Sequence, residues 1–218
     1  MGRDKALLPW PPQLRVPQVS ILRPGLPQPS APETSHLPAN TLLSAAILAL
    51  KPLAGTVIVV AGKNAESLAP VIDANSAILV RNPDPDRGQF SSLQVGLNQL
   101  LSLGCDAAII SPVDCPPLSA ASLALLQASF TRAVARDLWA VAPENNGRHG
   151  HPLFVNRELI GAFLATPATG NARQVLHQHA QRIEYVPVPD SLAKAGLNTP
   201  ADYDAALAPE GSTDADPG

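Results

Sequence analysis

Short apolar runs rich in β-branched residues alternate along the chain with segments of helical composition, and this alternation constrains the fold most. The clearest run is residues 56–61 (TVIVVA), typical of a strand covered on both faces. Strands separated by helices form βαβ units. We therefore predict a single doubly wound α/β domain with a mostly parallel sheet. The predicted strands are residues 56–61, 77–81, 107–111, 138–142 and 183–188, and the predicted helices are residues 41–50, 65–73, 91–103, 119–136, 158–164, 172–180 and 200–207.

One segment does not follow this pattern. Nine of the chain's 24 prolines fall between Pro9 and Pro38, and proline at such density excludes regular hydrogen bonding. We interpret residues 9–39 as an irregular, extended surface insertion, with a ligand for a proline-recognition domain as the alternative. The acidic residues 209–218 are predicted to be a disordered tail, so the domain spans residues 1–208.

The net charge of −3 argues against a protein that binds nucleic acid or an anionic membrane through its overall charge. No apolar run reaches the roughly 20 residues that span a bilayer, and the first ten residues do not read as a secretory signal. We expect a soluble, cytoplasmic protein without nucleic-acid or membrane partners. The two cysteines, Cys105 and Cys115, are too few for a disulfide scaffold and are interpreted as buried, inert thiols.

In an open parallel sheet, ligands bind beyond the carboxyl ends of the strands. Asp114 follows the predicted strand 107–111 in a turn stiffened by Pro112, Pro116 and Pro117. A carboxylate held there suits a hard cation such as Mg²⁺, whose remaining ligands come from water and substrate phosphates. The alternative is an aspartate that only caps the turn before the helix beginning at Ser119.

The loop after the predicted strand 77–81 leads directly into a helix. Asn82 follows that strand, Gly88 permits a close backbone approach, and Ser91 or Ser92 is expected to cap the helix, whose N-terminus favours an anion. An ordinary capped loop is the alternative interpretation.

Two further segments carry candidate residues. Near the amino terminus, Lys5 is a candidate point charge for a triphosphate, with a solvated terminal lysine as the alternative. Between Gly147 and Pro152, His149 and His151 alternate along a turn without a third ligand nearby. This spacing disfavours zinc, and we interpret the turn as a substrate contact or a structural loop.

Taken in order, these segments resemble the MobA-like nucleotidyltransferase family, which includes the enzymes that join CMP or GMP to molybdopterin. That family opens with a strand and the signature LAAGxSxRMGxxKxLLP, and Met1–Pro9 resembles its second half. The other matches are Asn82-Pro83 with Gly88 and Ser92-Leu93, Asp114-Cys115-Pro116, Gly150-His151-Pro152, and Asn198-Thr199-Pro200-Ala201-Asp202.

The resemblance implies a nucleotidyltransferase fold of the Rossmann-like type and transfer of a nucleoside monophosphate to a phosphorylated acceptor, with release of pyrophosphate. It implies catalytic roles for Lys5 and Asp114 and a Mg²⁺ ion at Asp114 and Asn198. The nucleotide-binding residues implied are Gly2, Lys5, Asn82, Gly88 and Ser92, and the acceptor-binding residues are Gly150, His151 and Pro152.

The sequence also departs from the family. The first half of the signature, with its glycine-rich phosphate loop, is not in the chain as printed, a pattern that a start assigned too far downstream or a truncated gene would produce. Asn198 stands where a second metal-binding aspartate is often found. We therefore expect poor transfer by the chain as printed. A catalytically inactive nucleotide-binding homologue and a sugar-phosphate nucleotidyltransferase remain alternatives, whereas no GxGxxG supports a dinucleotide oxidoreductase.

Overall fold

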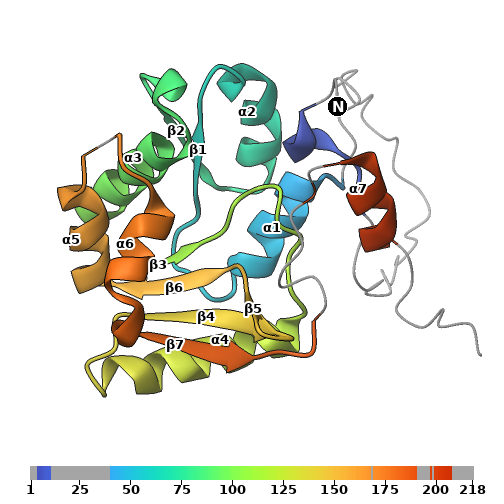
Figure 1. Cartoon of the computed structure of the whole chain (residues 1–218). Helices are drawn as coiled ribbons and strands as arrows, with labels where there is room; N and C mark the ends of the chain where they lie inside the picture. The colour runs from blue at the N-terminus through green and yellow to red at the C-terminus, as the bar shows by residue number, and fades with distance from the viewer. Residues whose placement is uncertain (1–3, 11–39, 168, 191–196, 198, 208–218) are drawn as a thin grey trace, which may run out of the picture.

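The computed structural model describes residues 4–10, 40–167, 169–190, 197 and 199–207, so the tail 209–218 and most of the insertion lie outside the described residues (Figure 1). No helix in this part of the chain is long and apolar enough to cross a membrane. The strands are β1 (Ile58–Ala61), β2 (Ile78–Arg81), β3 (Ala107–Ile110), β4 (Ala140–Asn145), β5 (Arg148–His149), β6 (Leu153–Asn156) and β7 (Ile183–Pro187). The α-helices are α1 (Leu42–Leu50), α2 (Ala65–Ala74), α3 (Gln89–Ser102), α4 (Ala120–Val134), α5 (Arg157–Ala165), α6 (Ala172–Gln178) and α7 (Pro200–Leu207), and the 3₁₀ helices are η1 (Lys5–Leu7), η2 (Pro85–Arg87) and η3 (Ala180–Arg182).

The α/β class predicted from the sequence is confirmed, and the strand pairing is more mixed than predicted. The described strands form two sheets, one of β1 and β2 and one in which β3, β6, β4 and β5 follow each other and β7 pairs with β4. β1–β2 and β4–β7 are parallel, whereas β6 is antiparallel to both β3 and β4.

A hairpin explains the antiparallel strand. Asn146 (φ 52°) and Gly147 (φ 72°) both adopt positive φ, the conformation of a tight two-residue turn, and Glu144 pairs with His149 on either side of it. The chain therefore reverses direction after β4 and enters the larger sheet again as β6, between β3 and β4. The three apolar residues that begin β6 were too short a run to predict a strand.

Helices cover both faces of the sheets. On one face α3, α5 and α6 pack over Ala108, Ala140 and Val155. On the other face α4 packs over Val141 and Phe154, and α1 and α2 pack over β1 and β2. The two sheets therefore lie within one three-layer arrangement, as Figure 1 shows.

The first helix of this arrangement is fixed by its cap and by the ends of the predicted insertion. Thr41 accepts a hydrogen bond from the Ser44 backbone N–H (3.1 Å), and the Ser44 hydroxyl accepts one from the Thr41 N–H (2.8 Å), which forms a buried capping box. Pro9 bridges to Thr41, and the Trp10 N–H donates to the Asn40 carbonyl at 3.0 Å. Residues 10 and 40 are therefore neighbours, and Trp10 is buried at 3% exposure.

Candidate active site

The carboxyl ends of β1, β2 and β3 lie near η1 and the start of α1, and we call this side of the sheets the carboxyl edge. Ala6 of η1 packs against Leu43 of α1 and Ala61 at the end of β1. Gly62 comes next, and a Cβ there would lie 2.7 Å from the Cβ of Pro85, so the loop after β2 rests directly on the end of β1.

Asn82 organises that loop. Its side-chain amide donates hydrogen bonds to the hydroxyls of Ser91 and Ser92, each at 2.9 Å, and its carbonyl oxygen accepts one from the Asp84 N–H at 3.0 Å. Asn82 is buried at 6% exposure, and Ser91 at 5%. The predicted nucleotide-binding residues Asn82 and Ser92 are thus brought into contact, with the Asn82 amide occupied by the two serines.

The cap predicted for the following helix is different in the structure. α3 begins at Gln89, two residues before the predicted start, and Gly88 occupies the N-cap position with φ 89°. The Ser91 hydroxyl donates to the Gly88 carbonyl at 2.8 Å and therefore lies in the first turn rather than at the cap. A positive φ that glycine adopts freely sets the start of the helix. The Gly88 N–H donates to the Pro85 carbonyl at 3.1 Å and the Ser91 N–H donates to the Gly88 carbonyl at 3.2 Å. The N–H groups of Gln89 and Phe90, which have no acceptor within the described chain, remain available to an anion.

Lys5 lies on η1. The side chain of Asp4 caps this turn by accepting from the Ala6 N–H at 3.1 Å, and its second oxygen accepts from the Asn64 side chain at 2.7 Å. Lys5 is partly exposed at the carboxyl edge. Gly2 lies outside the described residues.

Asp114 follows β3 in a closed turn, because the Cys115 N–H donates to the Pro112 carbonyl at 3.1 Å. The backbone carbonyl of Asp114 accepts a hydrogen bond of 2.8 Å from the N–H of Leu197, a fully buried residue that packs against Trp10 and Leu42. Asn198, the second predicted metal ligand, lies outside the described residues, but its neighbour in sequence is bonded to Asp114.

The neighbouring thiol is inert in this environment. Burial, and next the charge of Asp114, raise the pKa of Cys115 to about 12, so the thiol stays protonated near neutral pH. Both cysteines are free and only partly buried, which corrects the expectation that they are buried.

His151 is brought to the same place. It lies close to the backbone of Ile110, the last residue of β3, and to the charge of Asp114. Burial lowers the pKa of His151, and the Ile110 backbone and Asp114 oppose this effect only in part. Its Nδ1 is buried and has no hydrogen-bond partner within the described chain. The imidazole therefore offers one unsatisfied nitrogen beside Asp114.

The rest of the predicted acceptor side is held by the β4–β5 hairpin. The Gly150 N–H donates to the Pro143 carbonyl at 3.0 Å, and Pro152 is buried. His149 stacks on Tyr185 with ring centroids 3.5 Å apart.

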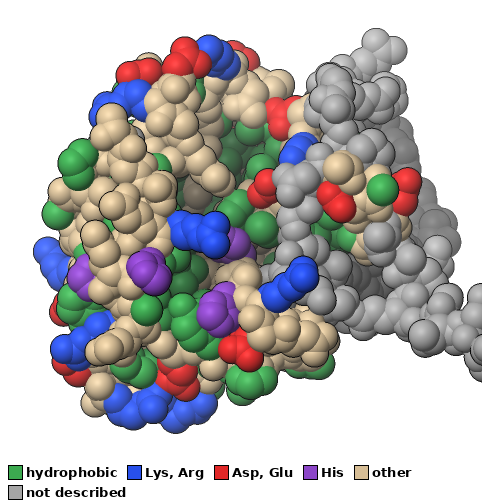
Figure 2. Space-filling model, viewed as in Figure 1, with side chains coloured by type: hydrophobic (Ala, Val, Ile, Leu, Met, Phe, Trp, Pro, Cys, Tyr) green, Lys and Arg blue, Asp and Glu red, His purple; other side chains and the backbone are tan. Residues whose placement is uncertain are grey.

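Among the described residues no three His, Cys, Asp or Glu side chains form a metal-binding group. Figure 2 shows Lys or Arg and His side chains near the middle of this face, a distribution that suits an anionic substrate.

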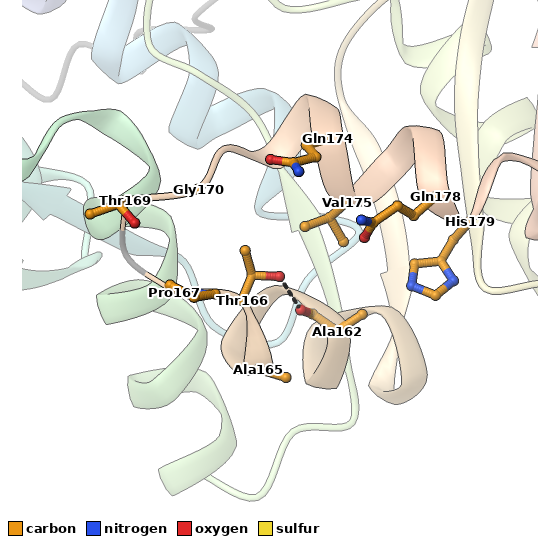
Figure 3. A pocket seen from close by; sticks show the side chains of 10 residues that line it. All are labelled: Ala162, Ala165, Thr166, Pro167, Thr169, Gly170, Gln174, Val175, Gln178 and His179. Atoms are coloured by element: carbon orange, nitrogen blue, oxygen red, sulfur yellow. Dashed lines mark hydrogen bonds between the residues drawn. The ribbon is translucent and has the colours of Figure 1, made fainter.

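A separate cavity of about 570 Å³ lies between α5 and α6 (Figure 3). Its wall includes Thr166, whose hydroxyl donates to the Ala162 carbonyl at 2.9 Å, and Gln174, Gln178 and His179. None of the predicted site residues lines it, and it has no Lys, Arg, Asp or Glu in its wall. A cavity without charged side chains does not complement a triphosphate, so we do not place the nucleotide there.

Two features of the site were not predicted from the sequence. The bond from Leu197 to Asp114 joins segments more than 80 residues apart, and no local pattern signals it. The hairpin that positions Gly150–Pro152 had a signal, since Asn146-Gly147 is the dipeptide most typical of a two-residue turn.

Comparison with known proteins decides the family. The sequence profile of the MobA-like NTP transferase domain matches residues 1–183, which is most of the chain. The chain belongs to this family. A nucleotidyltransferase domain makes it a transferase enzyme by class, and the resemblance seen in the sequence is confirmed.

Solved structures agree with this MobA-like domain at the level of the fold. Rv0371c from Mycobacterium tuberculosis H37Rv in complex with manganese has a TM-score of 0.61 at 17% identity, covering 77% of this chain and 86% of that chain. A nucleotidyl transferase from Methanothermobacter thermautotroptrophicus has a TM-score of 0.61 at 20% identity, covering 77% and 79%. A 4-diphosphocytidyl-2C-methyl-D-erythritol synthase has 0.57 at 16%, covering 77% and 89%. A comparison with curated protein sequences found no match.

Proposed function

We propose that this MobA-like protein is a Mg²⁺-dependent enzyme that moves a nucleoside monophosphate from CTP or GTP to a phosphorylated acceptor such as molybdopterin. An oxygen of the acceptor phosphate attacks the α-phosphorus, and the bond from that phosphorus to the β-phosphate breaks, so pyrophosphate leaves with the electron pair. The observation that supports the proposal is the hydrogen bond from the Leu197 N–H to the backbone carbonyl of Asp114, because it holds the residue before Asn198 against the turn that carries the strand-end carboxylate.

The residues beside Asp114 fit a divalent cation. A partly buried carboxylate at a strand end and an unsatisfied buried nitrogen of His151 lie together, and one structure of similar fold is a manganese complex. Asp114 and Asn198 would hold the ion, Asp114 by its charge and Asn198 as a neutral oxygen ligand. When bound, the cation supplies neutralisation of phosphate charge as the transition state forms.

The other residues position the two substrates. Lys5 neutralises triphosphate charge from η1, while Gly88 starts α3 so that its first turn presents the N–H groups of Gln89 and Phe90 to the phosphates. Asn82 and Ser92 keep that turn in place through the 2.9 Å bond between them. Gly150, His151 and Pro152 line the acceptor side, where the neutral imidazole accepts a hydrogen bond from an acceptor N–H or O–H.

A homologue that binds nucleotide without turnover is the alternative that the sequence leaves open. An enzyme that activates a sugar phosphate would use the same fold and metal chemistry. A cytoplasmic location stays a prediction from the sequence.

Pyrophosphate release with CTP, GTP and ATP separates these functions, measured with Mg²⁺ and with Mn²⁺ and with molybdopterin or a sugar phosphate as acceptor. Base and acceptor preferences identify the substrates. Nucleotide binding by calorimetry without pyrophosphate release under any of these conditions identifies the inactive homologue and refutes the proposed transfer.

A further inference from the structure

Two stacked rings lie on the larger sheet beside the predicted acceptor turn. The imidazole of His149, on β5, lies over the ring of Tyr185, on β7, with ring centroids 3.5 Å apart and an angle of 10° between the planes. β4 separates these strands, since Glu144 pairs with His149 on one edge and with Pro187 on the other. The imidazole therefore reaches across β4, and Ala142, which pairs with Tyr185, has a side chain short enough to let it pass.

The plane of the His149 ring is fixed from a second side. Its Nε2 lies 3.6 Å from Oε2 of Glu144, the residue opposite it in the hairpin. The backbone of Glu144 is held in turn, because its carbonyl accepts a hydrogen bond of 2.9 Å from the N–H of Val188. A ring held by a second ring and a carboxylate is already ordered, so a ligand that packs on it has little of the protein left to immobilise.

One face of this imidazole remains open. The His149 side chain is 48% exposed, although Tyr185 covers one face of its ring. The exposed area therefore belongs to the opposite face and to the ring edge. Figure 2 shows His side chains at the surface of the molecule, near Lys or Arg side chains. A flat aromatic surface of this kind accepts a further planar ring by offset stacking.

The open face lies close to the predicted acceptor turn. His149 and His151 are two residues apart, and two residues of extended chain span at most about 7 Å. His151 has a buried Nδ1 without a partner within the described chain, and it lies close to Asp114. A single small molecule can therefore reach from the side of Asp114 to the ring of His149.

We propose that the open face of His149, backed by Tyr185, is a platform on which a planar heteroaromatic ring of the acceptor stacks. The inference rests on the proposed function and deepens it, because it restricts the acceptor to phosphorylated molecules that carry such a ring, a class that excludes simple sugar phosphates. His149 determines specificity by contacting the ring and has no role at the reacting phosphate. Such a platform selects for a flat π-surface rather than for charge.

The base of the nucleotide is the other source of a planar ring, and its expected position fits the platform less well. We place the nucleotide phosphates at η1 and at the first turn of α3. η1 packs beside β1, and α3 follows the loop after β2, so both adjoin the smaller sheet. His149 lies in the larger sheet, in the hairpin that carries the acceptor turn.

The test compares two phosphates by calorimetry: neopterin phosphate, which carries a heteroaromatic ring, and ribose phosphate, which does not. We expect neopterin phosphate to bind at least about tenfold more tightly. His149→Ala should weaken its binding by about fivefold or more and leave that of ribose phosphate unchanged. His149→Phe keeps a flat ring and should restore most of the loss. Binding of neopterin phosphate no tighter than that of ribose phosphate would overturn the platform, as would a failure of His149→Phe to restore binding.

Arg148→Ala is the matched control in the same hairpin. Successive residues of a strand point to opposite faces of the sheet, so the exposed Arg148 side chain leaves β5 on the face away from His149. This variant should bind neopterin phosphate as tightly as the unmodified protein does. If His149→Ala lowers the thermal midpoint but binds neopterin phosphate normally, the stacked pair only packs the hairpin against the sheet and the proposal is refuted.

Titration with CTP and GTP in the presence of Mg²⁺ distinguishes the two sources of the ring. If nucleotide displaces neopterin phosphate and His149→Ala weakens nucleotide binding, the platform belongs to the base and the proposal is refuted. The platform and the transfer reaction also fail separately. Neopterin phosphate binding that depends on His149 without pyrophosphate release supports the platform and contradicts the transfer, whereas nucleotide transfer to ribose phosphate at an equal rate in His149→Ala contradicts the platform alone.

Discussion

The backbone N–H of Leu197 lies 2.8 Å from the carbonyl oxygen of Asp114 and donates a hydrogen bond to it. Leu197 is anchored in turn by Trp10 and Leu42 in a small buried cluster. The aspartate turn is therefore held from its far side by the core, and its carboxylate needs no structural role to keep the turn in place.

Asp114→Asn should therefore retain the fold and lose activity. The amide keeps the shape of the side chain but removes the charge that a cation needs, so transfer should fall by about a hundredfold or more. Binding of Mn²⁺, followed by electron paramagnetic resonance, should weaken in parallel. Where the chain as printed turns over too slowly to assay, the metal titration alone checks the prediction.

Asp106 provides the matched control, because it precedes β3 at the opposite end and forms an exposed ion pair with Arg157. Asp106→Asn should leave Mn²⁺ binding unchanged and change the free energy of unfolding by less than about 1 kcal/mol. Equal metal affinity in the Asp114 variant and the unmodified protein would show that Asp114 only closes the turn.

His151 gives a pH dependence with a definite sign. Burial lowers its pKa below the ordinary value of 6.5, so between the folded pKa and 6.5 the unfolded chain binds a proton that the folded chain does not. The free energy of unfolding should rise with pH through this window and level off above it. Urea unfolding from pH 4.5 to 8 in EDTA, compared between the unmodified protein and His151→Asn, isolates this contribution as a difference. His177→Asn, on the exposed side of α6, serves as the control, and a pH-independent difference for His151→Asn would contradict the prediction.

The sequence was informative where local patterns decide the structure. The helix after Thr41 and the run ending at Ala61 follow from short-range chemistry. The predicted helix 200–207 does so too, since Thr199 accepts a hydrogen bond from the Asp202 N–H at 3.1 Å at its start. β6 was missed because three apolar residues become a central strand only through the hairpin that precedes them. Burial of Trp10 within the predicted insertion depends on a partner, Leu197, at the other end of the chain.

In the candidate site, too, short-range features are predictable from the sequence and long-range contacts are not. Asp114 and the Gly150–Pro152 turn are predicted as site residues from their motifs, and the structure brings His151 of that turn beside Asp114. Nucleotide binding by Asn82 stays a prediction, and the structure adds a structural role, because a sequence reveals an asparagine after a strand but not that two serines occupy its amide.

Asn82→Ala should therefore destabilise the protein even without nucleotide. The substitution removes both bonds to the serines and the acceptor of the Asp84 N–H, and it leaves buried polar atoms unpaired, at a cost of about 1–3 kcal/mol. Urea unfolding checks this value. Asn64→Ala, at an exposed asparagine with one side-chain bond to Asp4, should cost less than about 0.5 kcal/mol. An unchanged stability in Asn82→Ala would mean that the residue serves nucleotide binding alone.

The last prediction concerns the proline-rich segment. Because the Trp10 N–H lies 3.0 Å from the Asn40 carbonyl, a short Gly/Ser linker can replace residues 11–39 without moving either end. The thermal midpoint should stay nearly unchanged, since lengthening or shortening a surface loop changes its closure entropy only slowly.

Trp10→Ala is the contrasting variant, because Trp10 is 3% exposed and packs edge-on against Tyr203 with ring centroids 6.2 Å apart. That truncation should cost about 3–5 kcal/mol and weaken the anchor of Leu197. If loop replacement lowers the thermal midpoint by many degrees, as much as Trp10→Ala does, then residues 11–39 contribute to the core.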